Sequence, residues 1–253
     1  MNILSKVFKK SPNASPKPVI YNDDTFLVSY PKSGNTWVRF IIANLLKKDS
    51  DHINFHTAVN YVPEIGIHNE IAENLERPRI LKSHQLYNSA FPKVVYLVRD
   101  PRDVYVSYYH YLKKRLPEST NFSQFLRDKI TSPDSWKAHV DSWKDKSNVI
   151  ATFKYEEMLA NTFEEVSRLA HVLGIIVDKE KIEQAVKASS FSKMKQIEQE
   201  NGRPFRNESD KATATSFVRK GKNGDWVNYF SSEDLEYLAQ NTSDLANRFG
   251  YQL

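Results

Sequence analysis

The 253-residue sequence contains no cysteine and no long apolar run. The absence of cysteine excludes a disulfide framework, a thiolate nucleophile and a cysteine-based zinc site. The longest apolar runs, such as 40–43, fall far short of the roughly 20 residues that a membrane-spanning helix needs. Residues 1–20 hold no sustained apolar segment with a small-residue cleavage site, so we expect no secretory signal. Together these absences favour a soluble cytoplasmic protein.

Positive charge is in slight excess, with 36 Lys and Arg against 31 Asp and Glu, but no compact basic run is present. A net charge of +5 is compatible with a polyanionic ligand, with acidic partners or with solubility alone. The basic residues are scattered, as is typical of solvated surfaces. We therefore expect neither a nucleic-acid-binding face nor contact with a membrane.

Short apolar strands alternate with amphipathic helices along most of the chain. We expect strands at 26–29, 79–82, 93–98 and 149–154, and helices at 37–47, 101–111, 135–143, 161–173, 179–187 and 232–249. The run KVVYLV at 93–98 is typical of a central parallel strand, and Asp100 and Pro101 are expected to begin the next helix. The alternation predicts an α/β fold with a central parallel sheet flanked by helices. We expect this fold to form a single domain at 18–253, after a flexible tail at 1–17.

The turn YPKSGNTW at 30–37 joins the first expected strand to the first expected helix. Lys32 adds a positive charge, the residues after it supply N–H and hydroxyl donors, and Gly34 permits close approach of a ligand. The turn is not a Walker A loop, because the first glycine is missing and the lysine precedes Ser-Gly. It indicates either a phosphate-binding turn or an ordinary strand-to-helix turn.

Two later segments also carry groups that can hold a phosphate. Arg99 follows the central strand, at the end where open α/β sheets bind ligands, and Ser107 lies on the next helix. An arginine can bind a phosphate through two parallel hydrogen bonds, and a serine hydroxyl can complete the pocket. Arg219, Lys220 and Gly221 combine two cations with a flexible backbone. Taken singly, these residues could equally belong to an ordinary surface or a basic turn.

In this order, the three segments resemble the sulfotransferase family that uses 3′-phosphoadenosine 5′-phosphosulfate (PAPS), above all its cytosolic branch. YPKSGNTW resembles the family's 5′-phosphosulfate loop, LVRDPRDVYVSYYHY its 3′-phosphate-binding strand and helix, and RKGKNGDWVNYF its C-terminal RKGxxGDWKNxF segment. The asparagine of YPKSGNTW makes the chain similar to bacterial members. The resemblance implies a P-loop-like sulfotransferase fold, PAPS as co-substrate, adenosine 3′,5′-bisphosphate (PAP) as product, and no metal.

The same resemblance implies most of the cofactor site. Lys32 matches the lysine that binds the 5′-phosphosulfate, and Trp37 matches the aromatic residue that stacks on adenine. The other matching residues are Ser33, Gly34, Asn35 and Thr36 at the 5′-phosphosulfate, Tyr155 and Phe191 beside adenine, and Arg99, Ser107, Arg219, Lys220 and Gly221 at the 3′-phosphate.

The segment LKSHQLY at 81–87 resembles the family's KTHLP segment and implies the catalytic residues. His84 corresponds to the catalytic base, and Lys82 to a cation of the catalytic site. Lys32 would stabilise the leaving phosphate, and Ser107 would hold Lys32 aside until an acceptor arrives. The implied reaction is an in-line transfer of the sulfuryl group to a hydroxyl or amine of a small-molecule acceptor.

Two parts of the chain depart from the family or bear on the acceptor. The segment VNYFSSEDLE at 227–236 retains only Glu236 of the family's dimerisation motif KxxxTVxxxE, so we expect a monomer or a dimer built in another way. Walls of the acceptor pocket are expected at 53–71, 87–91, 108–116 and 199–216. Residues 197–216 are polar without a period, which predicts a loop, and 199–216 could act as a lid.

Two other functions remain open on the sequence alone. The first is a P-loop-type nucleotide kinase or hydrolase, which would bind ATP in preference to PAPS. The second is a non-catalytic PAP-binding protein, which would show no turnover.

Overall fold

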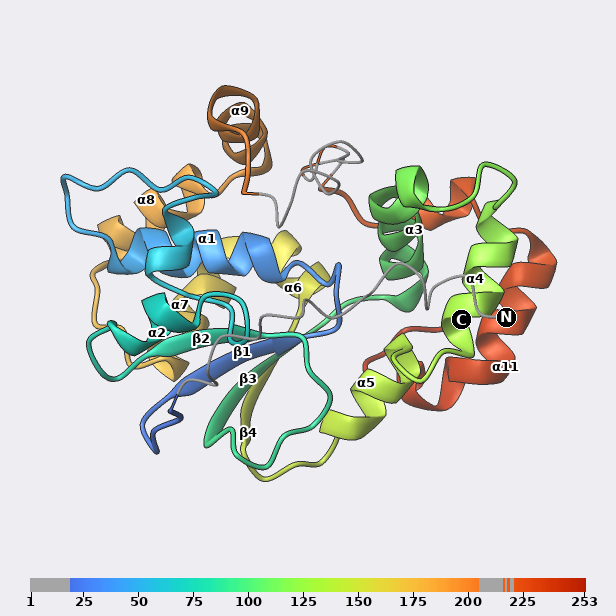
Figure 1. Cartoon of the computed structure of the whole chain (residues 1–253), viewed down its shortest axis with the longest axis horizontal. Helices are drawn as coiled ribbons and strands as arrows, with labels where there is room; N and C mark the ends of the chain where they lie inside the picture. The colour runs from blue at the N-terminus through green and yellow to red at the C-terminus, as the bar shows by residue number, and fades with distance from the viewer. Residues whose placement is uncertain (1–18, 205–215, 217, 219–220) are drawn as a thin grey trace.

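The computed structural model of the chain describes residues 19–204, 216, 218 and 221–253 (Figure 1). Its centre is a four-stranded parallel sheet with the strand order β2-β1-β3-β4. The strands are β1 (Thr25–Ser29), β2 (Ile80–Ser83), β3 (Lys93–Val98) and β4 (Val149–Lys154). The predicted α/β fold with a central parallel sheet is confirmed.

Helices cover both faces of the sheet (Figure 1). They are α1 (Asn35–Leu46), α2 (Asn69–Glu73), α3 (Pro101–Leu112), α4 (Phe122–Ile130), α5 (Trp136–Trp143), α6 (Tyr155–Ala160), α7 (Thr162–Val172), α8 (Lys179–Ala188), α9 (Phe191–Asn201) and α11 (Ser232–Arg248). Short 3₁₀ turns lie at η2 (Ala58–Asn60), η3 (Lys113–Arg115) and η4 (Asp225–Asn228). None of the helices in the described ranges is long and apolar enough to cross a membrane.

The two faces of the sheet are buried in two separate apolar clusters. Leu27 of β1 and Val95 and Leu97 of β3 pack with α1, α7 and α8. The alternate residues, such as Phe26 and Tyr96, pack with α3, α4, α5 and α11 on the other face. Because both faces of β3 are covered, its sequence is continuously apolar, as expected for a central parallel strand.

The start of α3 also follows the prediction. The Asp100 carboxylate accepts a hydrogen bond from the Arg102 N–H, and Pro101 occupies the first helical position. Proline is well suited to this position, since it has no N–H and the first N–H groups of a helix lack partners within the helix. This start places Arg99 just beyond β3, at the carboxyl edge of the sheet.

The loop predicted at 197–216 is wrong in its first five residues, 197–201. Helix α9 extends to Asn201, so 197–201 are helical. Met194 and Ile197 lie three residues apart and are buried against α1, whereas the rest of this turn is polar and exposed. Two apolar residues are too few to show a helical period in the sequence, and packing against the rest of the fold decides the conformation. The proposed lid at 199–216 lies mostly outside the described residues.

Candidate functional site

The turn between β1 and α1 has the backbone of an anion-binding loop. Lys32 and Gly34 both have positive φ angles, of 73° and 93°, and Gly34 is the N-cap of α1. A Cβ atom at Gly34 would lie 2.4 Å from Cδ2 of Tyr155, so only glycine fits beneath this ring. The first N–H groups of the 12-residue helix α1 have no partners within the helix and can bind an anion.

The residues predicted to hold the 5′-phosphosulfate divide into two groups. The hydroxyl of Ser33 is buried and has no hydrogen-bond partner among the described residues. Thr36 is partly exposed on the first turn of α1. Asn35 instead turns toward the sheet, where its Nδ2 donates to Ser29 Oγ at 3.1 Å. The side chain of Asn35 therefore anchors the loop to β1 through its Nδ2 group.

The side chain of Lys32 extends from the β1–α1 turn toward α3. Its ammonium sits 4.5 Å from the centroid of the Tyr111 ring, on α3. Burial, and secondarily nearby positive charge, lowers the pKa of Lys32 to about 7. The cations concerned are Arg203, Arg99 and Lys82. An anion bound beside Lys32 would neutralise the charge of these cations. It would also favour the protonated form of Lys32.

Ser107 lies on α3, one helical turn before Tyr111. It is therefore on the same helix face as the ring beside the Lys32 ammonium. The role implied for Ser107, to hold Lys32 aside, stays a prediction.

Arg99 connects three parts of the candidate 3′-phosphate site. Its Nη1 donates to the carbonyl of Lys32 at 3.3 Å, and its Nη2 donates to the carbonyl of Lys222 at 3.2 Å. The guanidinium also lies 4.3 Å from the centroid of the Tyr155 ring. Its Nε is buried without a hydrogen-bond partner in the described part of the chain. Arg99 thus joins the β1–α1 turn to the C-terminal segment.

The predicted aromatic residues lie close to the predicted glycines. Trp37 and Tyr155 meet edge to face, with centroids 5.5 Å apart, and Trp37 Nε1 donates to the Ser189 carbonyl at 3.0 Å. A Cβ atom at Gly221, whose φ is 61°, would lie 2.1 Å from Cδ2 of Phe191. Phe191 therefore packs directly on Gly221, as Tyr155 does on Gly34. Two further predicted residues of the clamp, Arg219 and Lys220, lie outside the described residues.

His84 follows β2 and is held by the end of the neighbouring strand β1. Its Nδ1 lies 2.7 Å from the Ser29 carbonyl oxygen. A carbonyl only accepts hydrogen bonds, so this contact assigns the proton of a neutral His84 to Nδ1 and leaves a lone pair on Nε2. Burial, followed by the charge of Lys82, lowers the pKa of His84 to about 3, against the opposing effect of Glu64. His84 is therefore neutral at pH 7 in this structure.

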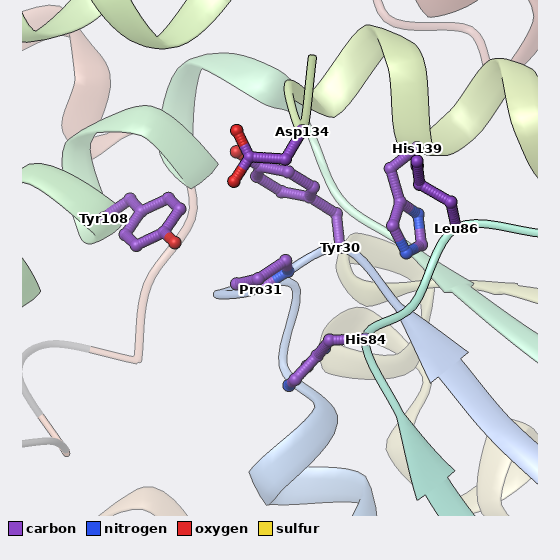
Figure 2. A pocket seen from close by; sticks show the side chains of 7 residues that line it. All are labelled: Tyr30, Pro31, His84, Leu86, Tyr108, Asp134 and His139. Carbon is purple, nitrogen blue, oxygen red and sulfur yellow. The ribbon is translucent and has the colours of Figure 1, made fainter. Parts of the chain in front are cut away.

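A pocket adjoins His84 at the carboxyl edge of the sheet. Its lining residues come from β1, β2, α3, α5 and their loops, and are Tyr30, Pro31, His84, Leu86, Tyr108, Asp134 and His139 (Figure 2). In this view His84 lies at one end of the pocket and Asp134 at the other, with Pro31 between them. The buried Tyr30 hydroxyl has no hydrogen-bond partner among the described residues.

Several polar residues of the site were not predicted. Glu64 pairs with Lys82, Asp103 contacts the C-terminal segment, and Asp134 pairs with Lys129 Nζ at 2.8 Å. Glu64 lies in a stretch without a period, so no sequence pattern could identify it. Asp103 stands four residues after Arg99, a spacing that could have indicated a link between them.

Comparison with known proteins agrees with the three motifs. Residues 22–250 match the sulfotransferase domain family. Mouse sulfotransferase 1 family member D1 is 32% identical over 236 residues, which cover 85% of this chain and 80% of the mouse protein. Human sulfotransferase 2B1 is 34% identical over 235 residues, which cover 86% of this chain and 64% of the human protein.

Solved structures show the same fold. Mouse sulfotransferase SULT7A1, crystallised with PAP, aligns with a TM-score of 0.67 at 26% identity, covering 90% of this chain and 85% of the mouse chain. Retinol dehydratase in a complex with retinol and PAP aligns with a TM-score of 0.67 at 22% identity, covering 92% and 85% of the two chains. These matches do not support a nucleotide kinase or hydrolase. The chain belongs to the sulfotransferase family, as its motifs predict, and is a transferase.

Proposed function

We propose that this protein transfers the sulfuryl group of PAPS to a hydroxyl or amine of a small-molecule acceptor, with His84 as general base. The observation that carries the proposal is the hydrogen bond between His84 Nδ1 and the Ser29 carbonyl. It orients a neutral imidazole whose Nε2 can accept a proton at the edge of the pocket. Lys32 and Arg99 approach the same edge of the sheet from the β1–α1 turn and from the end of β3.

The residues present fit PAPS as co-substrate. Two buried polar atoms without hydrogen-bond partners in the described part of the chain, Ser33 Oγ and Arg99 Nε, belong to residues that match phosphate ligands. Buried polar atoms are nearly always paired, so these two atoms favour a polar ligand between the loop and β3. Gly34 and Gly221 leave space for the rings of Tyr155 and Phe191 to pack on the backbone, and these two residues match the family's contacts to adenine.

In this proposal the protein contributes charge and proton transfer. His84 takes the proton of the acceptor at Nε2, which is typically worth about 10²–10⁴-fold in rate. Lys32 stabilises the charge that grows on the leaving 5′-phosphate, so its effect is larger in the transition state than in the ground state. When bound, PAPS supplies the sulfuryl group and the leaving phosphate.

The role of Lys82 is modified by its partner. Its ammonium is paired with the Glu64 carboxylate at 2.5 Å, and both side chains are nearly buried. We propose that Lys82 still serves as a cation of the catalytic site, oriented by Glu64. The pair is close to neutral overall, which limits the repulsion between Lys82 and a proton on His84.

The first experiment is calorimetric titration of PAP into the wild-type protein and the Arg99→Ala variant. The wild type should bind PAP, and the variant should lose at least about 2 kcal/mol, as expected for hydrogen bonds to a buried charge. Absence of PAP binding to the wild type overturns the proposed function. Equal PAP affinity of the wild type and the Arg99→Ala variant overturns the assignment of the 3′-phosphate site.

Catalysis is tested with radiolabelled PAPS and a panel of phenols, alcohols and amines. We expect His84→Gln to lower kcat about 10²-fold or more, with little change in the affinity for PAP. The matched control is His171→Gln, because His171 is exposed on α7, away from the pocket. Full activity of the His84 variant would contradict the role of His84, and tight PAP binding without turnover on any acceptor would favour the non-catalytic alternative.

A further inference from the structure

The C-terminal segment 222–226 lies against the first turn of α3 and is joined to it by one carboxylate. Oδ2 of Asp103 accepts a hydrogen bond from the Gly224 N–H at 2.8 Å, and Oδ1 accepts one from the Trp226 N–H at 3.2 Å. Asp103 is buried, so both of its oxygens are committed to this segment, which lies more than a hundred residues away in the chain. Hydrogen bonds to a charged acceptor are roughly twice as strong as neutral ones.

The same segment contacts the neighbours of Asp103. Arg99 Nη2 donates to the Lys222 carbonyl and lies 3.7 Å from Asp103 Oδ2. The Arg102 guanidinium lies 4.2 Å from the centroid of the Trp226 ring. Segment 222–226 is therefore attached to Arg99 and to the start of α3 at Lys222, Gly224 and Trp226, and Asp103 accepts two of these hydrogen bonds.

This attachment holds the part of the chain that directly follows Gly221. Gly221 packs under Phe191, and Gly221 and the two residues before it match the family's clamp on the 3′-phosphate. A segment fixed at Gly224 and Trp226 has lost most of its backbone freedom before a ligand arrives, so the ligand need not supply that ordering free energy. The 5′-phosphosulfate loop belongs to β1 and α1, whereas the two hydrogen bonds of the Asp103 carboxylate go to segment 222–226.

We propose that Asp103 is a positioning residue that fixes segment 222–226 on α3 and thereby gives the protein its preference for nucleotides with a 3′-phosphate. The inference rests on the proposed use of PAPS. The inference concerns selectivity between nucleotides. Asp103 exerts this effect through Arg99 and the C-terminal segment. An Asp103→Asn substitution keeps the size of the side chain but turns one acceptor into a donor, which then faces a backbone N–H.

The test compares PAP with adenosine 5′-monophosphate (AMP), which lacks the 3′-phosphate, by calorimetric titration. For Asp103→Asn we expect PAP affinity to fall at least about tenfold, the equivalent of one hydrogen bond to a charged group, while AMP affinity changes by less than about threefold. Asp141→Asn is the matched control, since Asp141 is an exposed acid on α5. A merely structural role would lower both affinities together, and this result, or unchanged PAP affinity, overturns the inference.

A second measurement uses the wild type and does not depend on the folding of a variant. Amide hydrogen exchange at Gly224 and Trp226 reports how often their hydrogen bonds to Asp103 open. We expect saturating PAP to slow exchange at both amides at least about tenfold more than saturating AMP does, because a 3′-phosphate favours the attached segment. Equal exchange with the two nucleotides contradicts the inference. Absence of PAP binding to the wild type rejects the proposed function, and the inference with it.

Discussion

Lys82 and Glu64 form a nearly buried ion pair beside His84, with Nζ and Oε2 2.5 Å apart. The pair depends on backbone pairing at the edge of the sheet, where the Lys82 N–H donates to the Pro63 carbonyl at 2.8 Å and the Ile65 N–H donates to the Lys82 carbonyl at 3.0 Å. The two charges act on the pKa of His84 in opposite directions. The pKa of His84 is therefore set partly by Glu64, a residue outside the three motifs.

Removal of Glu64 should destabilise the protein strongly. Glu64→Gln leaves the Lys82 ammonium in a nearly buried position without its counter-charge, which typically costs about 3 kcal/mol or more. Urea unfolding at pH 7 measures this loss. The double variant Glu64→Gln/Lys82→Met should lose less than the two single variants added together, since the unpaired charge is gone. Additive losses would show that the pair is not coupled.

The neutral state of His84 makes stability depend on pH. Its pKa is about 3 in the folded protein against an ordinary value of 6.5, so the folded state binds fewer protons between these limits. This contribution to stability is complete above about pH 6.5 and is lost as the pH falls toward 3. Its slope is at most about 1.4 kcal/mol per pH unit.

We expect the free energy of unfolding of His84→Gln to fall less than that of the wild type between pH 6.5 and pH 4. Urea titrations at a series of pH values measure this difference. Burial lowers the pKa of His139 to about 4, and His139 contributes in the same direction in both proteins, so their difference isolates His84. Identical pH profiles for His84→Gln and the wild type would contradict the lowered pKa of His84.

Binding of PAP should raise the pKa of Lys32 and take up protons. With a pKa of about 7, Lys32 is mostly neutral at pH 8, whereas the phosphates of PAP are fully ionised there. Titrations at pH 8 in buffers of different ionisation enthalpy should show an uptake approaching one proton per PAP. Lys32→Met should abolish it, and Lys179→Met, on the exposed surface of α8, should not. Binding enthalpies that do not depend on the buffer would exclude this linkage.

Gly34 should tolerate substitution less well than a second glycine with a similar backbone. Gly34→Ala and Gly66→Ala both place an alanine at a positive φ, of 93° and 84°, but only the first brings a Cβ atom within 4 Å of another residue, the Tyr155 ring. We expect Gly34→Ala to lose at least about 1 kcal/mol more of its free energy of unfolding, and to weaken PAP binding. Equal losses would show that contact with Tyr155 does not constrain the loop.

Local patterns in the chain were sufficient to predict most of the elements. The apolar run at 93–98 became β3, and Asp100 and Pro101 begin α3 as expected. These features depend on residues that are neighbours in sequence, such as a cap and the N–H two residues later. Helix α9 was not predicted, because its buried residues Met194 and Ile197 are held in a helix only by packing against α1 and its neighbours.

The order of residues along the chain shows which charged side chains stand at the ends of the strands, and it indicates a family and a ligand. Which of these side chains meet depends on how the strands and helices pack. The His84 imidazole contacts the Ser29 carbonyl because β1 and β2 are adjacent in the sheet. Glu64 meets Lys82, and Asp103 meets Gly224, across long separations in the chain. Such contacts form when elements pack and bury polar groups that must find partners, and no local pattern specifies the partner.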